Sequence, residues 1–150
     1  MKPSDITIEP AGEATLRSLL SLLAASGLPP EGLSDHLATA LVACDNGRVI
    51  GSAALELYGA SALLRSVAVA PDYQGQGLGR QLTRAAIDLA RRHGVTHLYL
   101  LTETAEAFFP QFGFGPIDRA DVPSQVKDSL EFTSLCPDSA LAMAAPVPVK

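Results

Sequence analysis

A glycine-rich stretch in the middle of the chain has the residue types and spacing to bind an anion. Residues 63–79 read LLRSVAVAPDYQGQGLG. This pattern predicts a buried strand over residues 63–70, a turn at Pro71-Asp72, and a loop that leads directly into a helix. Glycines at positions 75, 77 and 79 leave the loop without side-chain bulk, so several backbone N–H groups can approach one ligand. Because a helix N-terminus adds unsatisfied N–H groups and a positive dipole end, we expect a phosphate there.

Other phosphate-binding loops fit this stretch less well. A Walker A loop requires Gly-Lys-Ser/Thr, whereas Gly79 is followed by Arg80 and Gln81. A Rossmann fingerprint requires G-x-G-x-x-G, and the third glycine here comes one residue early. Glu103 lies about 20 residues further on, where a ribose-binding acid is expected, so nucleotide binding stays an alternative. A glycine-rich turn without a ligand is disfavoured, because glycine near a helix start lowers stability.

Length and composition predict a single acidic domain. The chain has 150 residues, of which 47% are hydrophobic and 18% are charged, and its net charge is −5. This length allows one domain with a substantial core, over residues 1–150. The negative charge argues against nucleic acid as a partner. An anionic ligand must then be held by local geometry, which Arg65, Arg80 and Arg84 would assist.

The sequence predicts neither a membrane segment nor a metal site. The apolar runs are interrupted well before membrane-spanning length, and the start, MKPSDITIEP, lacks the apolar core of a signal peptide. We therefore expect a cytoplasmic protein. Cys44 and Cys136 show no metal-ligand spacing, so reduced thiols are expected.

The elements around the loop predict a mixed sheet. Asp45-Asn46-Gly47 between two apolar runs is a strong hairpin signal, so antiparallel strands precede the loop. The long helix after the loop implies a right-handed crossover to a parallel strand. Such strands often separate at their carboxyl ends and leave a crevice for a ligand. The expected strands are 6–9, 39–44, 48–57, 63–70, 97–101, 113–118 and 140–144. The expected helices are 13–25, 31–37, the helix that runs from the glycine loop to about residue 93, 105–114 and 122–127. Residues 145–150 are expected to fray.

The loop resembles the signature of a known enzyme family. Gln74-Gly75-Gln76-Gly77-Leu78-Gly79 fits Q/R-x-x-G-x-G/A, the signature of the GNAT acetyltransferases, whose loop holds the pyrophosphate of acetyl-CoA. The resemblance implies an α/β (α+β mixed sheet) architecture, the GNAT acyl-CoA N-acyltransferase fold, with a central mixed sheet flanked by helices. It also implies acetyl-CoA as co-substrate and a small-molecule amine as acceptor. A homodimer through an exposed C-terminal strand is compatible with it.

A second segment extends the resemblance. Residues 105–114, AEAFFPQFGF, are similar to the family pattern N-x-x-A-x-x-F-Y-x-x-x-G-F, a helix beside the pantetheine arm of the cofactor. Thr102 stands at the Asn position and Phe109 at the Tyr position, and Pro110 is expected to kink or delay the helix. The cofactor-binding residues that the resemblance implies are Val67, Val69, Gln74, Gly75, Gln76, Gly77, Leu78, Gly79, Arg80, Thr102 and Phe109.

In this family the amine attacks the acetyl thioester directly, and the resemblance implies the same here. The backbone N–H near Val69 is then the expected oxyanion donor, and one such donor contributes about 3 kcal/mol. Glu56 and Glu103 each end a strand beside the expected crevice and are the candidate general bases. For each of them a surface carboxylate or an arginine partner is an equal alternative. His36 and His97 are weaker candidates.

The acid that protonates the departing thiolate has no obvious candidate. Phe109 has no proton to give. A thiol has a pKa of about 8.5, so its thiolate is a tolerable leaving group and a missing acid should slow the transfer rather than abolish it. Tyr58 or Tyr73 could substitute for the missing hydroxyl, although Tyr73 suits a packing role as well.

Arg65 is the candidate for substrate selection. It alternates with Val67 and Val69, so the three should share a face of the strand. A guanidinium there could hold an acidic group in bidentate fashion, and an ion pair with Glu56 is the equal alternative.

Four stretches resemble the GNAT branch associated with arsenic-resistance gene clusters. They are LLRSVAVAP, LYLLTETAEAFF, DRADVPSQVKDSLEF and SLCPDSALAM. The resemblance implies N-acetylation of small amino-acid-like toxins, including arsenic analogues of phosphinothricin. Arg65, Arg119 and Tyr58 are the candidate substrate-binding residues. The alternatives are an acyl-CoA-binding module without turnover, a GNAT protein for an unrelated amine or peptide, and a nucleotide-binding domain.

Overall fold

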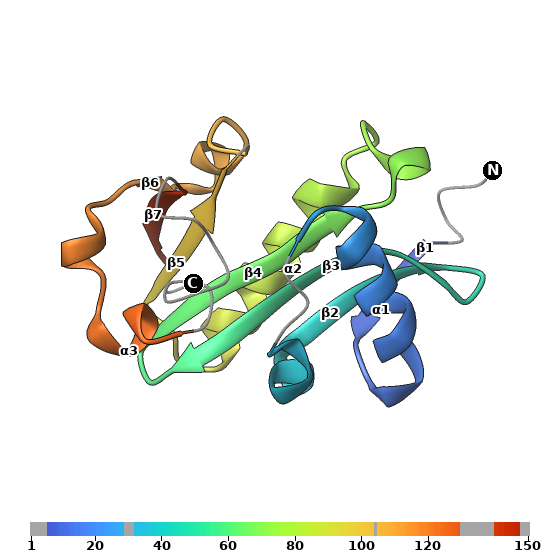
Figure 1. Ribbon diagram of the computed structural model, residues 1–150, viewed down its shortest axis with the longest axis horizontal. Helices are drawn as coiled ribbons and strands as arrows, with labels where there is room; N and C mark the ends of the chain where they lie inside the picture. The colour runs from blue at the N-terminus through green and yellow to red at the C-terminus, as the bar shows by residue number, and fades with distance from the viewer. Residues whose placement is uncertain (1–5, 29–31, 104, 130–139, 148–150) are drawn as a thin grey trace.

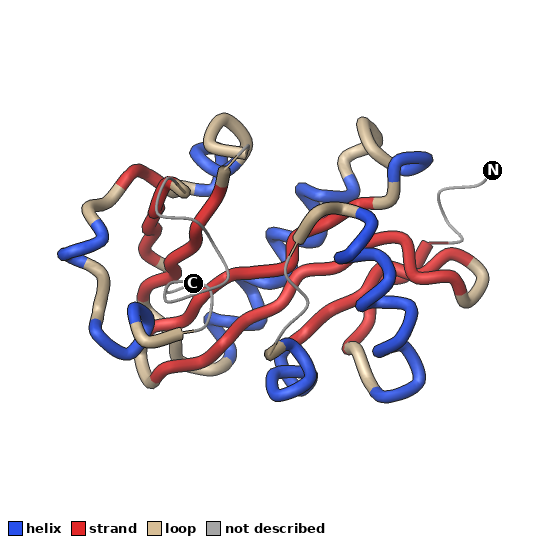
Figure 2. Tube along the Cα trace, in the orientation of Figure 1, coloured by secondary structure: helices blue, strands red, loops and turns tan. Residues whose placement is uncertain are grey.

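Seven strands form one mixed β-sheet in the part of the chain that the computed structural model describes, residues 6–28, 32–103, 105–129 and 140–147. The strand order is β1-β2-β3-β4-β5-β7-β6, with helices on both faces (Figure 1, Figure 2). The strands are β1 (Ile6–Pro10), β2 (Ala40–Asp45), β3 (Arg48–Tyr58), β4 (Ser61–Val69), β5 (His97–Thr102), β6 (Gly115–Pro116) and β7 (Leu141–Pro146). The α-helices are α1 (Glu13–Ala25), α2 (Leu78–Arg92) and α3 (Ser124–Lys127), and the 3₁₀ helices are η2 (Leu33–Thr39), η3 (Pro71–Tyr73), η4 (Phe109–Phe112) and η5 (Arg119–Asp121).

The N-terminal half of the sheet is antiparallel, as the hairpin signal predicts. β1 pairs with β2, β2 with β3, and β3 with β4. In the turn between β2 and β3, Asn46 has a φ of 52° and Gly47 a φ of 84°. A tight hairpin turn requires positive φ at both central positions, which Asn-Gly tolerates well.

β4 and β5 are neighbours at one end only. They run parallel, as the crossover through α2 requires. The paired residues are Ser61 with His97, Ala62 with Leu98, and Leu63 with Tyr99. Beyond these pairs the two strands diverge (Figure 1), and β7 continues to pair with β5 as far as Thr102. The predicted separation of the parallel strands is therefore confirmed.

The two faces of the sheet carry different helices. α2 lies on one face and α1 on the other (Figure 1). On the α2 face, Leu82 packs over Gly51 of β3. On the opposite face, Leu63 and Tyr99 form a smaller apolar cluster with Val122 and with Val126 of α3.

The C-terminal third differs most from the sequence prediction. The helix expected over residues 105–114 is instead a turn followed by η4, because Pro110 cannot donate a helical hydrogen bond. The strand expected over 113–118 is only the two-residue β6. β7 runs through Pro146 and Val147 is buried, so the prediction of a frayed tail was wrong for residues 145–147, while 148–150 lie outside the described residues.

The edge prediction was also wrong, and one helix changed type. β7 is paired on both sides, with β5 and with β6, so it is not an exposed edge for a homodimer. The short helix expected over 31–37 is the 3₁₀ helix η2, and α3 begins two residues later than expected. The helix over 13–25 is confirmed.

Gly51 tests how tightly α2 packs on the sheet. A Cβ at this position would lie 2.7 Å from Leu82 Cδ1 and 3.3 Å from the carbonyl oxygen of Ala68. Because Leu82 is fully buried and cannot swing away, we expect Gly51→Ala to lower the free energy of unfolding by about 1–3 kcal/mol in urea denaturation. Gly115→Ala is the matched control, since no atom lies within 4 Å of its Cβ position. Equal stability of the two variants would contradict the packing described.

Candidate functional site

The glycine loop opens α2 with free backbone donors. Gly75 and Gly77 have φ values of 80° and 84°, and Gly77 is the N-cap of α2. The first hydrogen bond of the helix runs from the Gln81 N–H to the Gly77 carbonyl oxygen, at 3.1 Å. The N–H groups of Leu78, Gly79 and Arg80 therefore precede the helical ladder, at the positive end of the helix dipole.

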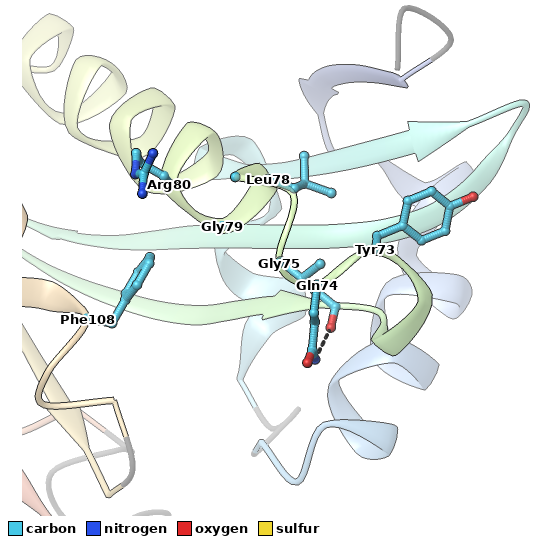
Figure 3. Close-up of a pocket in the computed structure, with 9 residues that line it drawn as sticks. Tyr73, Gln74, Gly75, Leu78, Gly79, Arg80 and Phe108 are labelled. Carbon is cyan, nitrogen blue, oxygen red and sulfur yellow. Dashed lines mark hydrogen bonds between the residues drawn. The ribbon is translucent and has the colours of Figure 1, made fainter. Parts of the chain in front are cut away.

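A pocket of about 320 Å³ lies against this helix start (Figure 3). The Gln74 side chain ties the loop to the end of β4, because its Nε2 donates to the Val69 carbonyl oxygen at 2.9 Å. The residues that line the pocket are Val69, Tyr73, Gln74, Gly75, Gly77, Leu78, Gly79, Arg80 and Phe108. Most of the predicted cofactor-binding residues are thus brought together in one place.

Gly79 lines this pocket together with Val69 and Phe108. A Cβ there would lie 3.6 Å from Phe108 Cζ and 3.6 Å from Val69 Cγ2. The aromatic ring and the valine therefore both border the space that a Cβ would occupy. A glycine leaves this gap open, and a larger side chain would fill it.

Phe108, and not Phe109, faces the pocket. Phe109 is buried and packs edge-on against Phe114 and Phe108, with ring centroids 5.7 Å and 5.1 Å apart. The sequence prediction assigned Phe109 to the cofactor from its place at the Tyr position. The neighbouring Phe of the same pattern was the available signal for Phe108.

Arg80 connects the helix start to the segment after β5. Its Nε donates to Gln111 Oε1 at 3.1 Å, and Gln111 Nε2 donates to the Phe108 carbonyl oxygen at 2.8 Å. This chain of bonds holds η4 beside α2 and leaves the exposed guanidinium next to the pocket. A permanent positive charge and the helix dipole therefore act on the same volume.

Tyr73 anchors the loop to the β2–β3 hairpin. Its hydroxyl donates to Asp45 Oδ2, and Asp45 Oδ1 has no partner among the described residues. The hydrogen bond to Asp45 raises the pKa of Tyr73, and burial adds to the effect. Arg48 lies over the ring, with its guanidinium carbon 6.0 Å from the ring centroid. The packing role expected for Tyr73 is the one its surroundings support.

Glu56 lies on the opposite face of the sheet, in a buried polar cluster. Its Oε2 accepts a hydrogen bond from Arg65 Nη1 at 2.8 Å, and its Oε1 accepts one from the Tyr58 hydroxyl. His36 Nε2 lies 3.8 Å from the same Oε1. Arg65 Nε also donates to Ser66 Oγ at 3.1 Å. Glu56 and Arg65 are 3% and 2% exposed, so a substrate cannot reach either without disrupting the cluster.

A β-bulge at Ser66 explains why Arg65 lies there. Ser66 has a φ of 61°, and β4 carries one residue more than β3 between the pairs Ala54 with Arg65 and Ser52 with Ala68. Side chains alternate along a strand, so the extra residue places Arg65 and Val69 on opposite faces. The prediction that Arg65, Val67 and Val69 share a face was therefore wrong. The alternative, an ion pair of Arg65 with Glu56, is what the structure contains.

Four other predicted residues do not line the pocket. Thr102 Oγ1 accepts a hydrogen bond from the Ala105 N–H at 2.9 Å and so closes the turn after β5. Glu103 follows that strand and is exposed, and Gln76 Nε2 bonds the Asp72 carbonyl oxygen at 3.3 Å. Val67 is partly buried in β4.

The last two predicted residues, Arg119 and His97, do not line the pocket either. Arg119 Nη2 donates to the Ala140 carbonyl oxygen at 2.8 Å. His97 starts β5 and is exposed, with Nδ1 3.2 Å from Thr96 Oγ1.

The sequence and fold match one protein family. The model of the Acetyltransferase (GNAT) family matches residues 9–114. The chain belongs to this acetyltransferase family, and the mixed seven-stranded sheet with flanking helices is the fold that its structural relatives share. The fold and the family inferred from the loop resemblance are both confirmed.

Two relatives by sequence cover part of the chain. An uncharacterized N-acetyltransferase, CT2212, from Chlorobaculum tepidum is 30% identical over 97 residues, which are 64% of this chain and 62% of that protein. An amino-acid acetyltransferase from Aeromonas salmonicida is 32% identical over 80 residues, 52% of this chain and 18% of that protein. The matches thus span less than two thirds of either relative.

Two solved structures share the fold. N-acetylglutamate synthase from Neisseria gonorrhoeae, complexed with coenzyme A and N-acetyl-glutamate, has a TM-score of 0.82 at 20% identity and covers 98% of this chain and 36% of that one. Rv2747 from Mycobacterium tuberculosis, in complex with CoA and NLQ, has a TM-score of 0.80 at 21% identity, covering 95% and 99%.

The described residues contain neither a membrane-spanning helix nor a metal-binding cluster. None of their helices is both long and apolar enough to cross a membrane. No group of three or more His, Cys, Asp or Glu side chains among them could hold a metal ion.

Tyr73→Phe tests the anchor of the loop. Because the pKa of Tyr73 is raised in the folded protein, the stabilisation by its hydrogen bond is fully present below the ordinary tyrosine pKa of about 10 and is lost as the pH rises through the folded value. We expect the variant to unfold at lower urea than the wild type at pH 8, and the difference to shrink at strongly alkaline pH. Tyr99→Phe, a buried tyrosine on β5, is the control. A difference that grows above pH 10 would contradict the assignment.

Proposed function

We propose that the protein is an acetyl-CoA-dependent N-acetyltransferase that acetylates the primary amine of a small, amino-acid-like molecule. The observation that carries the proposal is the pocket at the start of α2, where free helix N–H groups, a glycine loop and Arg80 converge. It lies where β4 and β5 have separated. Structural relatives crystallised with coenzyme A support the same reading.

The residues of this pocket fit the diphosphate and the arm of coenzyme A. Gly75 and Gly77, both at positive φ, let the backbone approach an anion closely. Arg80 supplies a charge beside them. Val69 and Phe108 leave an apolar slot over Gly79, which suits the thin chain of pantetheine. When bound, acetyl-CoA supplies an acetyl group already activated as a thioester.

We propose that the pantetheine arm of coenzyme A lies along the edge of β4 that β5 leaves unpaired. Past Leu63, no residue of β4 pairs with β5 in the described chain. The Val69 carbonyl oxygen already accepts a hydrogen bond from Gln74, so we assign the other backbone groups of Val67 and Val69 on this edge to the amides of pantetheine. We assign the N–H near Val69 to the thioester oxygen, where it would stabilise developing negative charge.

The acceptor is proposed to be an amino acid or a close analogue. The amino-acid acetyltransferase of Aeromonas salmonicida and the N-acetylglutamate complex of the Neisseria gonorrhoeae enzyme support this class. The finer proposal, detoxification of arsenic analogues of phosphinothricin, draws its support from the sequence resemblance. The surroundings of Arg65 do not favour this substrate class, because the Arg65 guanidinium already forms an ion pair with Glu56. Such an enzyme would work in the cytoplasm, where acetyl-CoA is available.

A second candidate is an acyl-CoA-binding module without turnover. The observation that favours it is Phe109, which stands where the family pattern has a tyrosine and is buried in the core. It supplies no proton for the thiolate. Because a thiolate leaves without an acid at moderate cost, this absence favours slow transfer over none.

Turnover separates the two candidates. We expect release of free thiol from acetyl-CoA in the presence of at least one amine from a panel of amino acids, phosphinothricin and its arsenic analogue. Turnover confined to acidic analogues would support the detoxifying role. Binding of CoA by calorimetry with no thiol release from any amine would favour the module instead.

Arg80→Ala tests the phosphate cradle. Losing a charge-assisted contact to phosphate should raise the KM for acetyl-CoA about tenfold, with little change in kcat. Arg84→Ala is the matched control, because this exposed arginine lies one turn further along α2 and, contrary to the expectation from sequence, does not line the pocket. Acetyl-pantetheine, which lacks the diphosphate, should be used equally by all three proteins. An Arg80→Ala effect that persists with acetyl-pantetheine would place the arginine elsewhere in the reaction.

A further inference from the structure

Glu56 is closed to solvent on every side that the structure describes. It is 3% exposed, and both of its carboxylate oxygens accept hydrogen bonds, one from Arg65 and one from Tyr58. A general base must reach the proton that it removes, within hydrogen-bond distance or through one water. The geometry therefore argues against direct proton transfer from a substrate to Glu56.

His36 extends this cluster to the surface. Its side chain is 28% exposed, and its Nε2 lies 3.8 Å from Glu56 Oε1. No hydrogen bond joins Nδ1 to another residue in the described ranges, so this nitrogen has a lone pair for an outside group when Nε2 carries the proton. One nitrogen of the imidazole thus lies within ion-pair distance of the buried carboxylate, and the ring is partly open to solvent.

The backbone around His36 is built to hold it there. Within η2, His36 departs from helical geometry, with φ −124° and ψ 22°. The Thr39 hydroxyl, at the end of η2, donates to the Leu55 carbonyl oxygen at 2.6 Å and lies 3.3 Å from the His36 carbonyl oxygen. The kinked turn is therefore fixed to β3 one residue before Glu56.

The cluster lies beside the point where the sheet opens. Glu56 is the cross-strand partner of Leu63, the last residue of β4 that pairs with β5. Arg65 reaches the bulge at Ser66 through its Nε. Alternation along β3 places Glu56 on the face opposite Gly51 and Leu82, away from the α2 side. A cosubstrate in the pocket and an acceptor beside His36 would approach each other from opposite faces of the sheet, through the gap between β4 and β5.

We propose that His36 is the catalytic proton acceptor for the incoming ammonium group, and that Glu56 positions its imidazole. This inference rests on the proposed N-acetyltransferase function and names the base for it. His36 Nδ1 takes one proton from the ammonium group, and the amine lone pair then forms the N–C bond to the acetyl carbon. As the C–S bond breaks, the second amine proton is transferred to the sulfur, and imidazolium returns its proton to solvent.

Among the described residues, several charged and polar groups surround the imidazole. Glu56 and Tyr58 face it from β3, Arg65 lies behind Glu56 on β4, and Asp35 is its neighbour in η2. Glu56 is a poor target for substitution, because its removal would leave Arg65 buried without this carboxylate. His36 can be exchanged with far less disturbance, since it is partly exposed.

His36→Gln is the test of the catalytic role. With the best amine of the panel, we expect kcat to fall about 100-fold or more, while the KM for acetyl-CoA and the urea midpoint stay within error. The pH profile of kcat/KM should also differ between the wild type and the variant, because the proposed proton acceptor has been removed. His93→Gln, an exposed histidine at the C-cap of α2, should behave as the wild type in every measurement. A profile and kcat unchanged by His36→Gln would overturn the proposal.

A measurement without turnover tests the positioning. The ¹⁵N chemical shifts of neutral imidazole report which ring nitrogen carries the proton. We expect the Nε2–H tautomer at His36, because Nε2 is the ring nitrogen that lies near the Glu56 carboxylate, and we expect Nδ1 to be unprotonated. A dominant Nδ1–H tautomer would overturn the inference even if acetyl transfer occurs. If the wild type acetylates no amine, the proposed function fails first and the assignment of a base fails with it.

Discussion

The separation of β4 from β5 is the constraint on which the site depends. The crossover through α2 makes the strands parallel, yet only Ser61, Ala62 and Leu63 of β4 have partners in β5. The rest of β4 keeps one backbone edge without a strand, and backbone groups that leave water need partners. Close to that edge, the glycine loop starts α2 with N–H groups that the helix itself does not satisfy. A ligand that combines amides with a diphosphate satisfies both sets of groups at once, so the fold favours acetyl-CoA over a ligand that carries phosphate alone.

The bulge at Ser66 determines which side chains of β4 face the pocket and which face the opposite side of the sheet. With Arg65 paired to Ala54 and Val69 paired to Gly51, the basic side chain and the pocket valine point in opposite directions. A regular strand would have placed the Arg65 guanidinium on the pocket side and left Glu56 without its partner. Because of the bulge, the cation that serves the pocket is Arg80, which is carried by the helix start itself. Arg65 is instead used to neutralise a buried carboxylate.

The sequence predicted the elements that follow from local chemistry. The Asn-Gly turn, the helix over 13–25 and the glycine loop are set by backbone preferences of the residues themselves, and each is confirmed. The position of Arg65 could not be predicted, because Ser66 carries no signal that it will take a left-handed conformation, and one extra residue reverses every face assignment after it. Phe108 and Phe109 are likewise adjacent and chemically alike, so only the path of the chain around Pro110 decides which ring enters the core.

In the polar cluster around Glu56, the stable burial of a charge and the exchange of a proton with substrate and solvent require different residues. A buried ion pair is stable only while its hydrogen bonds remain in place, so opening Glu56 to a substrate would cost the network that Arg65 and Tyr58 complete. A group that gains and loses a proton in each turnover needs contact with both substrate and solvent. Assigning the fixed charge to Glu56 and the mobile proton to His36 separates these tasks. The kink in η2 serves this division, because it holds the imidazole between a carboxylate that stays buried and a surface from which the proton can depart.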